Sequence, residues 1–263
     1  MRARETPYAS AIIPCIDVAG GRAVPPAGIG GLSDPADPAE IASVYAEAGA
    51  DRIFVDAQEP WAEHETFLPL LKRMTDAGAD LWVTVDNGFM PSLGAAEALL
   101  GAGAAAVGMS TTSVERPALL HTFAQRHGAE RVIGVMNASR VGGDHWNIAV
   151  RGGGQATDLD AVTWARMLAD LGAGCLLVNS LDMEGTGRGY DIPLTRAVAD
   201  AVPVPVIASG GCGTLEHLHD GLTEGHAQCV LVNKMAHSGD HTIGEMTDYL
   251  RREGPAGRAE VPT

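Results

Sequence analysis

Eight short apolar runs alternate with helical patterns along nearly the whole chain, and this alternation restricts the fold more than any other feature. The runs are continuously apolar, as parallel strands buried on both faces are. They span residues 11–16, 52–55, 81–85, 105–109, 132–136, 175–178, 204–208 and 229–232. Eight strand–helix units predict a single (β/α)8 barrel, a TIM barrel of the α/β class, as one domain over residues 1–263. A doubly wound sheet is the alternative, and the even spacing fits it less well.

The helical patterns between these runs have recognisable ends. They span residues 38–48, 65–77, 92–102, 115–127, 159–171, 192–201, 215–224 and 243–252. Asp37 before Pro38 predicts an N-cap with proline inside the first turn. The first five patterns each stop at a glycine, which tolerates the left-handed conformation of a helix C-terminus: Gly49, Gly78, Gly103, Gly128 and Gly172. Residues 1–10 and 255–263 fall outside the pattern and are expected to be flexible tails.

The chain also repeats itself. Residues 49–56 resemble residues 172–179, which sets Asp56 against Asn179 at an offset of 123 positions. The same offset aligns residues 83–88 with 206–211, and 107–110 with 230–233, while Asp17 pairs with Asn137 at an offset of 120. A nearly constant offset predicts two fused half-barrels of four units each.

Composition restricts the partners. The 18 Lys and Arg against 33 Asp and Glu leave a net charge of -15, which excludes nucleic acid and anionic membrane surfaces as expected partners. No apolar run reaches the roughly 20 residues of a membrane span, and the first ten residues lack a signal-peptide core. The four cysteines, without C-x-x-C spacing, are expected to be reduced thiols: Cys15, Cys175, Cys212 and Cys229. We therefore expect a cytoplasmic protein, with homo-oligomerisation left open.

Polar residues follow the apolar runs where each predicted strand ends. Working groups in this fold lie at the carboxyl ends of the strands, so these residues predict a functional mouth. They are Asp17, Asp56, Asp86, Ser110, Asn137, Asn179, Asp182, Glu184, Ser209 and Asn233.

The seventh run ends in a glycine-rich turn that suits a phosphate group. Ser209, Gly210, Gly211 and Gly213 lead into a helix, and such a turn exposes backbone N–H groups beside the positive helix end. Asn233 and Lys234, after the eighth run, are expected beside it.

The repeat counterpart of this turn is Asp86-Asn87-Gly88, where an ionised carboxylate would repel a phosphate. We expect it to hold a hydroxyl, an amine or a metal. A divalent cation shared by Asp17, Asp56 and Asp86 is an alternative, although no metal or cofactor is part of the main prediction.

Three motifs carry a resemblance to a known family. They are IIPCIDV at residues 12–18 followed by Gly21 and Arg22, DMEGT at 182–186 followed by GYD at 189–191, and IASGG at 207–211. The chain resembles the histidine-biosynthesis barrel family over residues 11–254. The first two motifs favour the cyclase subunit of imidazole glycerol phosphate synthase over the ribonucleotide isomerase. The resemblance implies a duplicated half-barrel and places Asp17 at a catalytic aspartate.

The chain departs from that family at several functional positions. The second catalytic aspartate falls at Asn137, and an amide cannot exchange protons at neutral pH. The phosphate-contacting lysine of loop one falls near Pro25-Pro26, and Glu184 replaces an aspartate. The charged gate that admits ammonia falls near four residues, of which only one is charged: Ala11, Arg52, Ala106 and Cys175. These departures argue against a glutaminase partner that supplies ammonia.

We therefore expect a divergent paralogue, recruited to specialised metabolism, that performs cyclisation, isomerisation or lyase chemistry on a singly phosphorylated, sugar-linked metabolite. Asp17, Asn137, Asp182 and Glu184 are its predicted catalytic residues. The remaining substrate contacts are predicted at Asp56, Asp86, Asn87, Ser110, Asn179 and Ser180. A genuine histidine-pathway cyclase and a catalytically silent ligand-binding or regulatory subunit are the alternatives.

One further segment has two interpretations. Residues 142–154 contain His145 and Trp146 between glycine pairs and triplets, which predicts a hairpin near the mouth. It is either a mobile lid or a plain structural hairpin.

Overall fold

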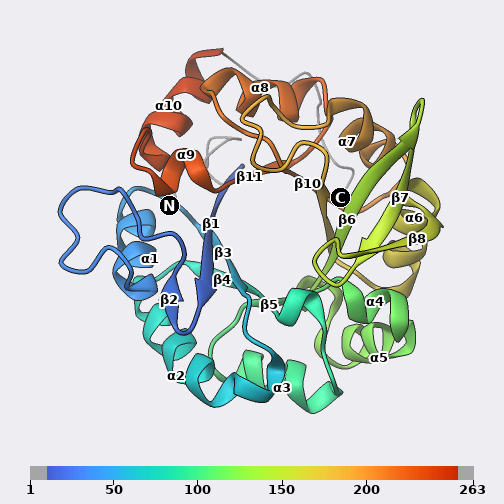
Figure 1. Ribbon diagram of the computed structural model, residues 1–263, viewed down its shortest axis with the longest axis horizontal. Helices are drawn as coiled ribbons and strands as arrows, with labels where there is room; N and C mark the ends of the chain where they lie inside the picture. Colours follow the sequence, from blue (N-terminus) through green and yellow to red (C-terminus); the bar gives the residue numbers. More distant parts are fainter. Residues whose placement is uncertain (1–10, 254–263) are drawn as a thin grey trace, which may run out of the picture.

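A closed barrel of parallel strands forms the centre of the molecule, as Figure 1 shows for the computed structural model. The structure describes residues 11–253, apart from the side chains of Glu63 and His64. Within that range eight parallel strands form the barrel: β1 (Ile12–Ala19), β3 (Arg52–Ala57), β4 (Asp80–Val85), β5 (Ala106–Met109), β6 (Val132–Gly142), β9 (Cys175–Ser180), β10 (Val206–Ser209) and β11 (Cys229–Val232). The predicted TIM barrel is confirmed. The predicted flexible tails lie outside the described residues.

The barrel closes where β5 pairs with β6. Its strands follow the order β5-β4-β3-β1-β11-β10-β9-β6, so the chain runs once around the barrel. Three short strands add to it. β2 (Arg22–Ala23) pairs antiparallel with β1, and β7 (His145–Val150) and β8 (Gln155–Asp160) extend β6 as an antiparallel sheet.

Helices surround the barrel on its outside (Figure 1). Among the described residues they are α1 (Pro38–Glu47), α2 (His64–Met74), α3 (Leu93–Gly101), α4 (Thr111–Glu115), α5 (Pro117–His127), α6 (Ala161–Leu171), α7 (Ile192–Ala199), α8 (Leu215–Thr223), α9 (Lys234–His237) and α10 (Ile243–Glu253). The predicted helix over 115–127 is wrong at its start, because Pro117 restricts the preceding Arg116 to a non-helical conformation. None of the described helices is long and apolar enough to cross a membrane.

The glycines behind the first five helical patterns adopt positive φ angles as predicted, but Gly128, with a ψ of 150°, lies outside the left-handed helical region. Each has a positive φ angle, from 82° at Gly78 to 109° at Gly103. Asp37 caps α1 by accepting a hydrogen bond from the Ala39 N–H at 3.0 Å. Local capping therefore ends these elements where the sequence pattern ends them.

The sheet register confirms the internal repeat but corrects one of its strands. Asp17 pairs with Asp56 across β1 and β3 as Asn137 pairs with Asn179 across β6 and β9. On the next strands, however, Asp56 pairs with Thr84 while Asn179 pairs with Ser209. The counterpart of Ser209 is therefore Thr84, and the prediction of Asp86 at that position is wrong by two residues. A shift of two preserves which side chains face inward, so sequence periodicity cannot detect it.

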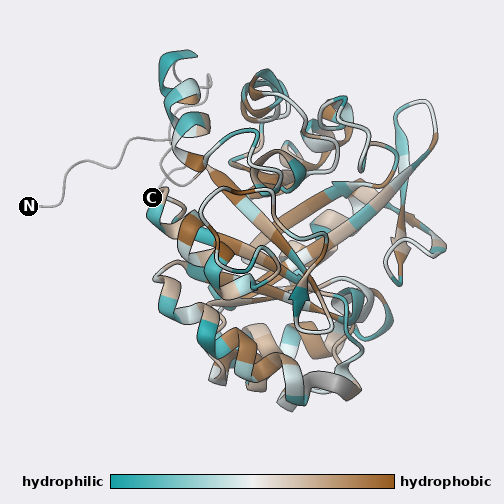
Figure 2. Ribbon diagram, turned by 60° about the vertical axis from the view of Figure 1, so that its left-hand side comes forward, coloured by the Kyte–Doolittle hydropathy of each residue, from teal (hydrophilic) through white to brown (hydrophobic). Residues whose placement is uncertain are grey.

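The inside of the barrel is apolar below its mouth. Inward-facing side chains from the strands form one buried cluster, which includes Ile13, Phe54, Ile133 and Leu177. In Figure 2 the central strands are mostly coloured as hydrophobic, and the surrounding helices carry both hydrophobic and hydrophilic residues. Two of the four expected ammonia-gate positions, Ala106 and Cys175, belong to this apolar cluster. Ala106 and Cys175 are buried, and the Arg52 guanidinium lies 5.3 Å from the Trp82 ring centroid.

Candidate active site

A ring of polar side chains lines the mouth of the barrel. One residue comes from the carboxyl end of each described barrel strand: Asp17, Asp56, Thr84, Ser110, Asn137, Asn179, Ser209 and Asn233. All eight face one cavity of about 1280 Å³. We call these residues the mouth ring. Seven of them were predicted from the sequence, and Thr84 was not.

Strand periodicity allows Thr84 in the ring but does not single it out. Side chains of a strand alternate between two faces, so Trp82 and Thr84 share a face while Asp86 begins the following turn. Alignment of the two half-barrels on the glycine after β4 sets Asp86 against Ser209, and Asp86 is the wrong polar residue.

The first half of the mouth ring is acidic. Thr84 Oγ1 donates to Asp56 Oδ1 at 2.5 Å, and Asn233 Nδ2 donates to Asp17 Oδ2 at 2.7 Å. The Cys15 thiol lies 3.5 Å from the other oxygen of Asp17. Each carboxylate is thus held by neutral donors, which fix its orientation without neutralising its charge.

Burial raises the pKa of Asp56 to about 6. The Thr84 hydrogen bond opposes this rise, while the nearby carboxylates of Asp17 and Glu184 add to it. Burial, together with the same acidic neighbourhood, also holds the pKa of the Cys15 thiol well above its usual range. Cys15 therefore stays protonated as a hydrogen-bond donor rather than acting as a thiolate nucleophile.

The second half of the mouth ring carries amides and hydroxyls. Asn179 Nδ2 donates to Asn137 Oδ1 at 3.1 Å and to Glu184 Oε2 at 3.1 Å. Asn137 Nδ2 lies 3.4 Å from Ser110 Oγ, and Ser209 Oγ donates to Asn179 Oδ1 at 3.1 Å. This connected chain can bind polar groups of a ligand but offers no proton-exchanging group apart from Glu184.

The glycine-rich turn after β10 lies at the same mouth. Gly210 and Gly211 adopt φ angles of 90° and 97°. A Cβ on Gly211 would lie 2.2 Å from the Gly189 carbonyl oxygen, so glycine is required there. Gly213 also lines the cavity, but its N–H donates to His217 Nδ1 at 3.2 Å and is already used within the protein. Lys234 lies in the same cavity wall, at the start of α9.

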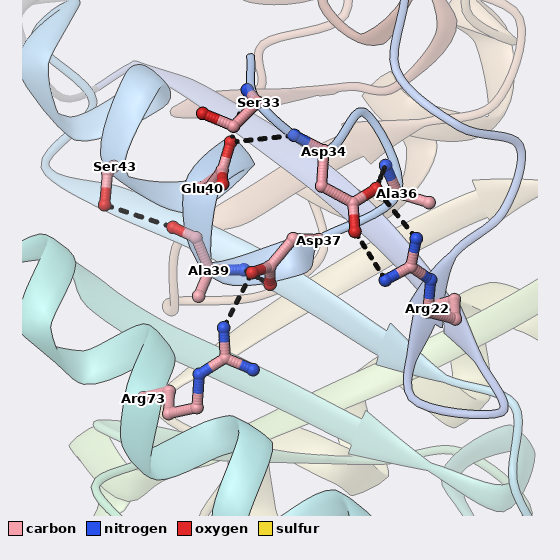
Figure 3. A network of polar contacts seen from close by, with 9 residues as sticks. All are labelled: Arg22, Ser33, Asp34, Ala36, Asp37, Ala39, Glu40, Ser43 and Arg73. Carbon is pink, nitrogen blue, oxygen red and sulfur yellow. Dashed lines mark hydrogen bonds and ion pairs between the residues drawn. The ribbon is translucent and has the colours of Figure 1, made fainter.

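Loop one, residues 20–37, covers one side of the mouth. Its Pro25, Pro26 and Gly28 line the cavity. Figure 3 shows how polar contacts hold the outer part of this loop against α1 and α2. Arg22 forms two hydrogen bonds of 2.7 Å with Asp34.

The inner part of loop one is held by His237, the last residue of α9. The buried His237 ring contacts the Pro25 carbonyl oxygen at 2.7 Å through Nε2 and the Tyr45 hydroxyl at 3.3 Å through Nδ1. The Gly28 N–H donates to the His237 carbonyl oxygen at 2.8 Å. His237 was not predicted as a site residue, because nothing in its sequence context separates it from a surface helix residue.

Three predicted site residues do not line the cavity. Asp86 lies beyond the end of β4 in a left-handed conformation, and its Oδ2 lies 3.3 Å from the Trp61 N–H. The exposed Asp182 accepts a hydrogen bond from the Arg140 N–H at 2.7 Å, and Ser180 is buried. The expectation that these three face the mouth is wrong, because strand alternation and the turn direct them elsewhere. The alternative of a cation between Asp17, Asp56 and Asp86 therefore has no geometric support, and no cluster of three or more metal-ligating residues occurs in the described part of the chain.

The predicted hairpin is part of the fold and not a loose flap. Trp146 is 2 % exposed, donates from Nε1 to Asp191 Oδ2 at 3.0 Å, and packs against the Arg140 guanidinium. The same Asp191 accepts from Arg140 and, as the N-cap of α7, from the Leu194 N–H in the first turn of that helix. Of the two interpretations, these contacts favour the structural hairpin for the segment that carries Trp146.

The turn between β7 and β8 lies beside the turn formed by Asp86, Asn87 and Gly88. The Arg151 N–H donates to Thr111 Oγ1 at 2.9 Å, and that hydroxyl donates to the Asn87 carbonyl oxygen at 3.1 Å. A Cβ on Gly152 would lie 2.4 Å from Asn87 Oδ1. Asn87, a predicted ligand contact, lines the cavity, and its side chain lies close to this turn.

Comparison with known proteins agrees with this architecture. The family model described as "Histidine biosynthesis protein" matches residues 11–242. The chain belongs to this family. The histidine-biosynthesis family consists generally of enzymes of that pathway, which fits a duplicated barrel with a polar mouth. Membership does not distinguish a lyase or cyclase from an isomerase, so the reaction must be argued from the mouth ring itself.

Proposed function

We propose that this protein is an acid/base enzyme of the histidine-biosynthesis family that acts on a sugar-linked metabolite with one phosphate group. The observation that carries the proposal is the asymmetry of the mouth. Acidic residues, Asp17 and Asp56, occupy one half of the ring, and the glycine turn with Lys234 lies by the other half. The phosphate group of a ligand would bind at the glycine turn, and its reacting atoms would lie near the two aspartates.

A single phosphate is supported by the contrast between the two half-barrels. The turn after β10 offers backbone N–H groups at Gly210 and Gly211, the positive end of α8, and Lys234. The corresponding turn of the first half-barrel contains Asn87. Gly152 of the β7–β8 turn lies next to the Asn87 side chain and takes up the space there. A second phosphate would meet this turn instead of an open cradle.

The proposed reaction is a cyclisation, isomerisation or lyase step in specialised metabolism, without ammonia from a glutaminase. Asp17 would transfer the proton, and Asn137 would orient the substrate through its amide. Glu184, from the loop after β9, would contact the substrate beside Asn179. The apolar layer beneath the ring, with the buried Ala106 and Cys175, favours a site supplied from the mouth alone.

Binding of inorganic phosphate tests the anion site. We expect Lys234→Met to weaken phosphate binding by at least about tenfold, because one charge-assisted contact is worth about 1.5–3 kcal/mol. Isothermal titration calorimetry should give one site per wild-type chain. Lys72→Met is the matched control, since Lys72 is the other lysine and lies on the outer helix α2. Equal weakening by both variants, or none by Lys234→Met, would contradict the site.

A histidine-pathway cyclisation is the second candidate, since the family match is to a histidine-biosynthesis protein. Complementation of a cyclase-deficient auxotroph separates the two. We expect no growth, because the residue opposite Asp17 in the repeat is the amide Asn137. Growth that depends on Asp17 would instead assign the histidine-pathway reaction.

A further inference from the structure

The two aspartates of the mouth ring are neighbours in the sheet. Asp17 and Asp56 are register partners on β1 and β3, where adjacent strands lie about 4.8 Å apart. Both side chains face the same cavity. Their carboxylates are close enough that the charge of Asp17 raises the pKa of Asp56, so ionisation of one carboxylate disfavours ionisation of the other.

The charged surroundings do not relieve this repulsion. Among the described residues no salt bridge joins a lysine, arginine or histidine to either aspartate. Glu184 adds a third carboxylate from the loop after β9, and the Cys15 thiol faces the pair from β1. Lys234 and His237 line the same cavity wall, and the ring nitrogens of His237 contact Tyr45 and Pro25.

The hydrogen bonds distinguish the two carboxylates. Asp17 receives Asn233 Nδ2 on one oxygen and the Cys15 thiol on the other. Asp56 receives the Thr84 hydroxyl on Oδ1 alone. Because donors stabilise the ionised form, the doubly hydrogen-bonded Asp17 is favoured as the ionised member of the pair and Asp56 as the protonated member. The raised pKa of Asp56, due to burial first and to Asp17 in part, agrees with this order.

We propose that Asp17 and Asp56 share one proton and act together as base and acid, so that both proton-transfer groups come from the first half-barrel. This inference rests on the proposed function. Ionised Asp17 removes a proton from one substrate atom, whose bonding electrons stay on the substrate. Protonated Asp56 gives its proton to a second substrate atom. Return of the proton from Asp17 to Asp56 restores the starting state, so the cycle needs no other reactant.

Carbon-13 NMR of the full chain, labelled at its aspartate carboxyls, tests the pair. We expect one carboxyl signal with a midpoint near pH 6 that disappears in Asp56→Asn. In Asp17→Asn the same midpoint should fall by at least half a pH unit (about a threefold change in the proton affinity of Asp56), because the like charge is gone. In Thr84→Val it should rise, because the donor that stabilises ionised Asp56 is lost.

Asp86→Asn is the matched control, because Asp86 follows β4 but does not line the cavity. An Asp56 midpoint that stays the same in Asp17→Asn, or that already lies in the ordinary aspartate range, would overturn the pair. If Asp17→Asn does not fold, the Asp17 signal followed in Asp56→Asn gives the reciprocal measurement. Phosphate binding is measured independently of this titration, so a failure of the anion site is distinguishable from a failure of the pair.

Discussion

The pKa of Asp56 is set by its burial and by the groups around it. Aspartate is normally ionised well below neutral pH, yet burial raises the pKa of Asp56 to about 6. The sequence places this residue at a strand end, as it places Asp17 and Asn137. Which of them lies beside another carboxylate depends on the order of strands in the closed sheet.

The raised pKa of Asp56 makes a prediction for stability. A carboxyl group whose folded pKa exceeds its unfolded value destabilises the protein as pH rises from about 4 to about 6. Asp56→Asn should therefore raise the free energy of unfolding by about 3 kcal/mol at pH 7.5, with the gain fading below about pH 4. Urea titrations across this range measure the difference. A gain that is constant with pH would contradict the prediction, and Asp86→Asn supplies the comparison.

At the scale of elements, the extension β6–β7–β8 supports the loop that follows β9. Asp191 is 5 % exposed and accepts hydrogen bonds from the Trp146 indole, the Arg140 guanidinium and the Leu194 N–H. The loop between Asp182 and Asp191 then packs against the glycine turn, where the Gly189 N–H donates to the Gly211 carbonyl oxygen at 2.8 Å. The hairpin thus acts on the mouth through a second loop.

Loss of the Asp191 carboxylate should be costly for this arrangement. Asp191→Ala removes a helix cap and leaves buried donors without an acceptor, so we expect a loss of about 2–4 kcal/mol in unfolding free energy. Limited proteolysis should show faster cleavage in residues 182–190. Asp144→Ala is the control, because the Asp144 side chain is 86 % exposed and contacts Arg140 at 3.4 Å. Similar effects of both variants would contradict this role for Asp191.

The whole molecule consists of two four-stranded halves that meet along two seams. One seam is the pairing of β5 with β6, and the other is the pairing of β11 with β1. Each half alone would leave both of these strand edges unpaired, and exposed edges invite association. The barrel is closed only when both halves are present.

Division of the chain in the connection between α5 and β6 tests this view. We expect fragments 1–128 and 129–263 to aggregate or self-associate when produced separately, and to form a soluble 1:1 complex when produced together. Size-exclusion chromatography with light scattering measures both outcomes. A stable monomer of either fragment would contradict the prediction that the seams are needed.

Local sequence patterns by themselves determined the number of strand–helix units, the glycine ends of five helices, the duplication and most of the mouth ring. These properties depend on the backbone preferences of single residues and on the burial of continuous apolar strands. Only the tertiary structure decided that Thr84 and not Asp86 completes the ring, and that Asp17 lies beside Asp56. Strand register and strand order are set by long-range pairing, and a shift of two residues leaves the hydrophobic pattern of a strand unchanged.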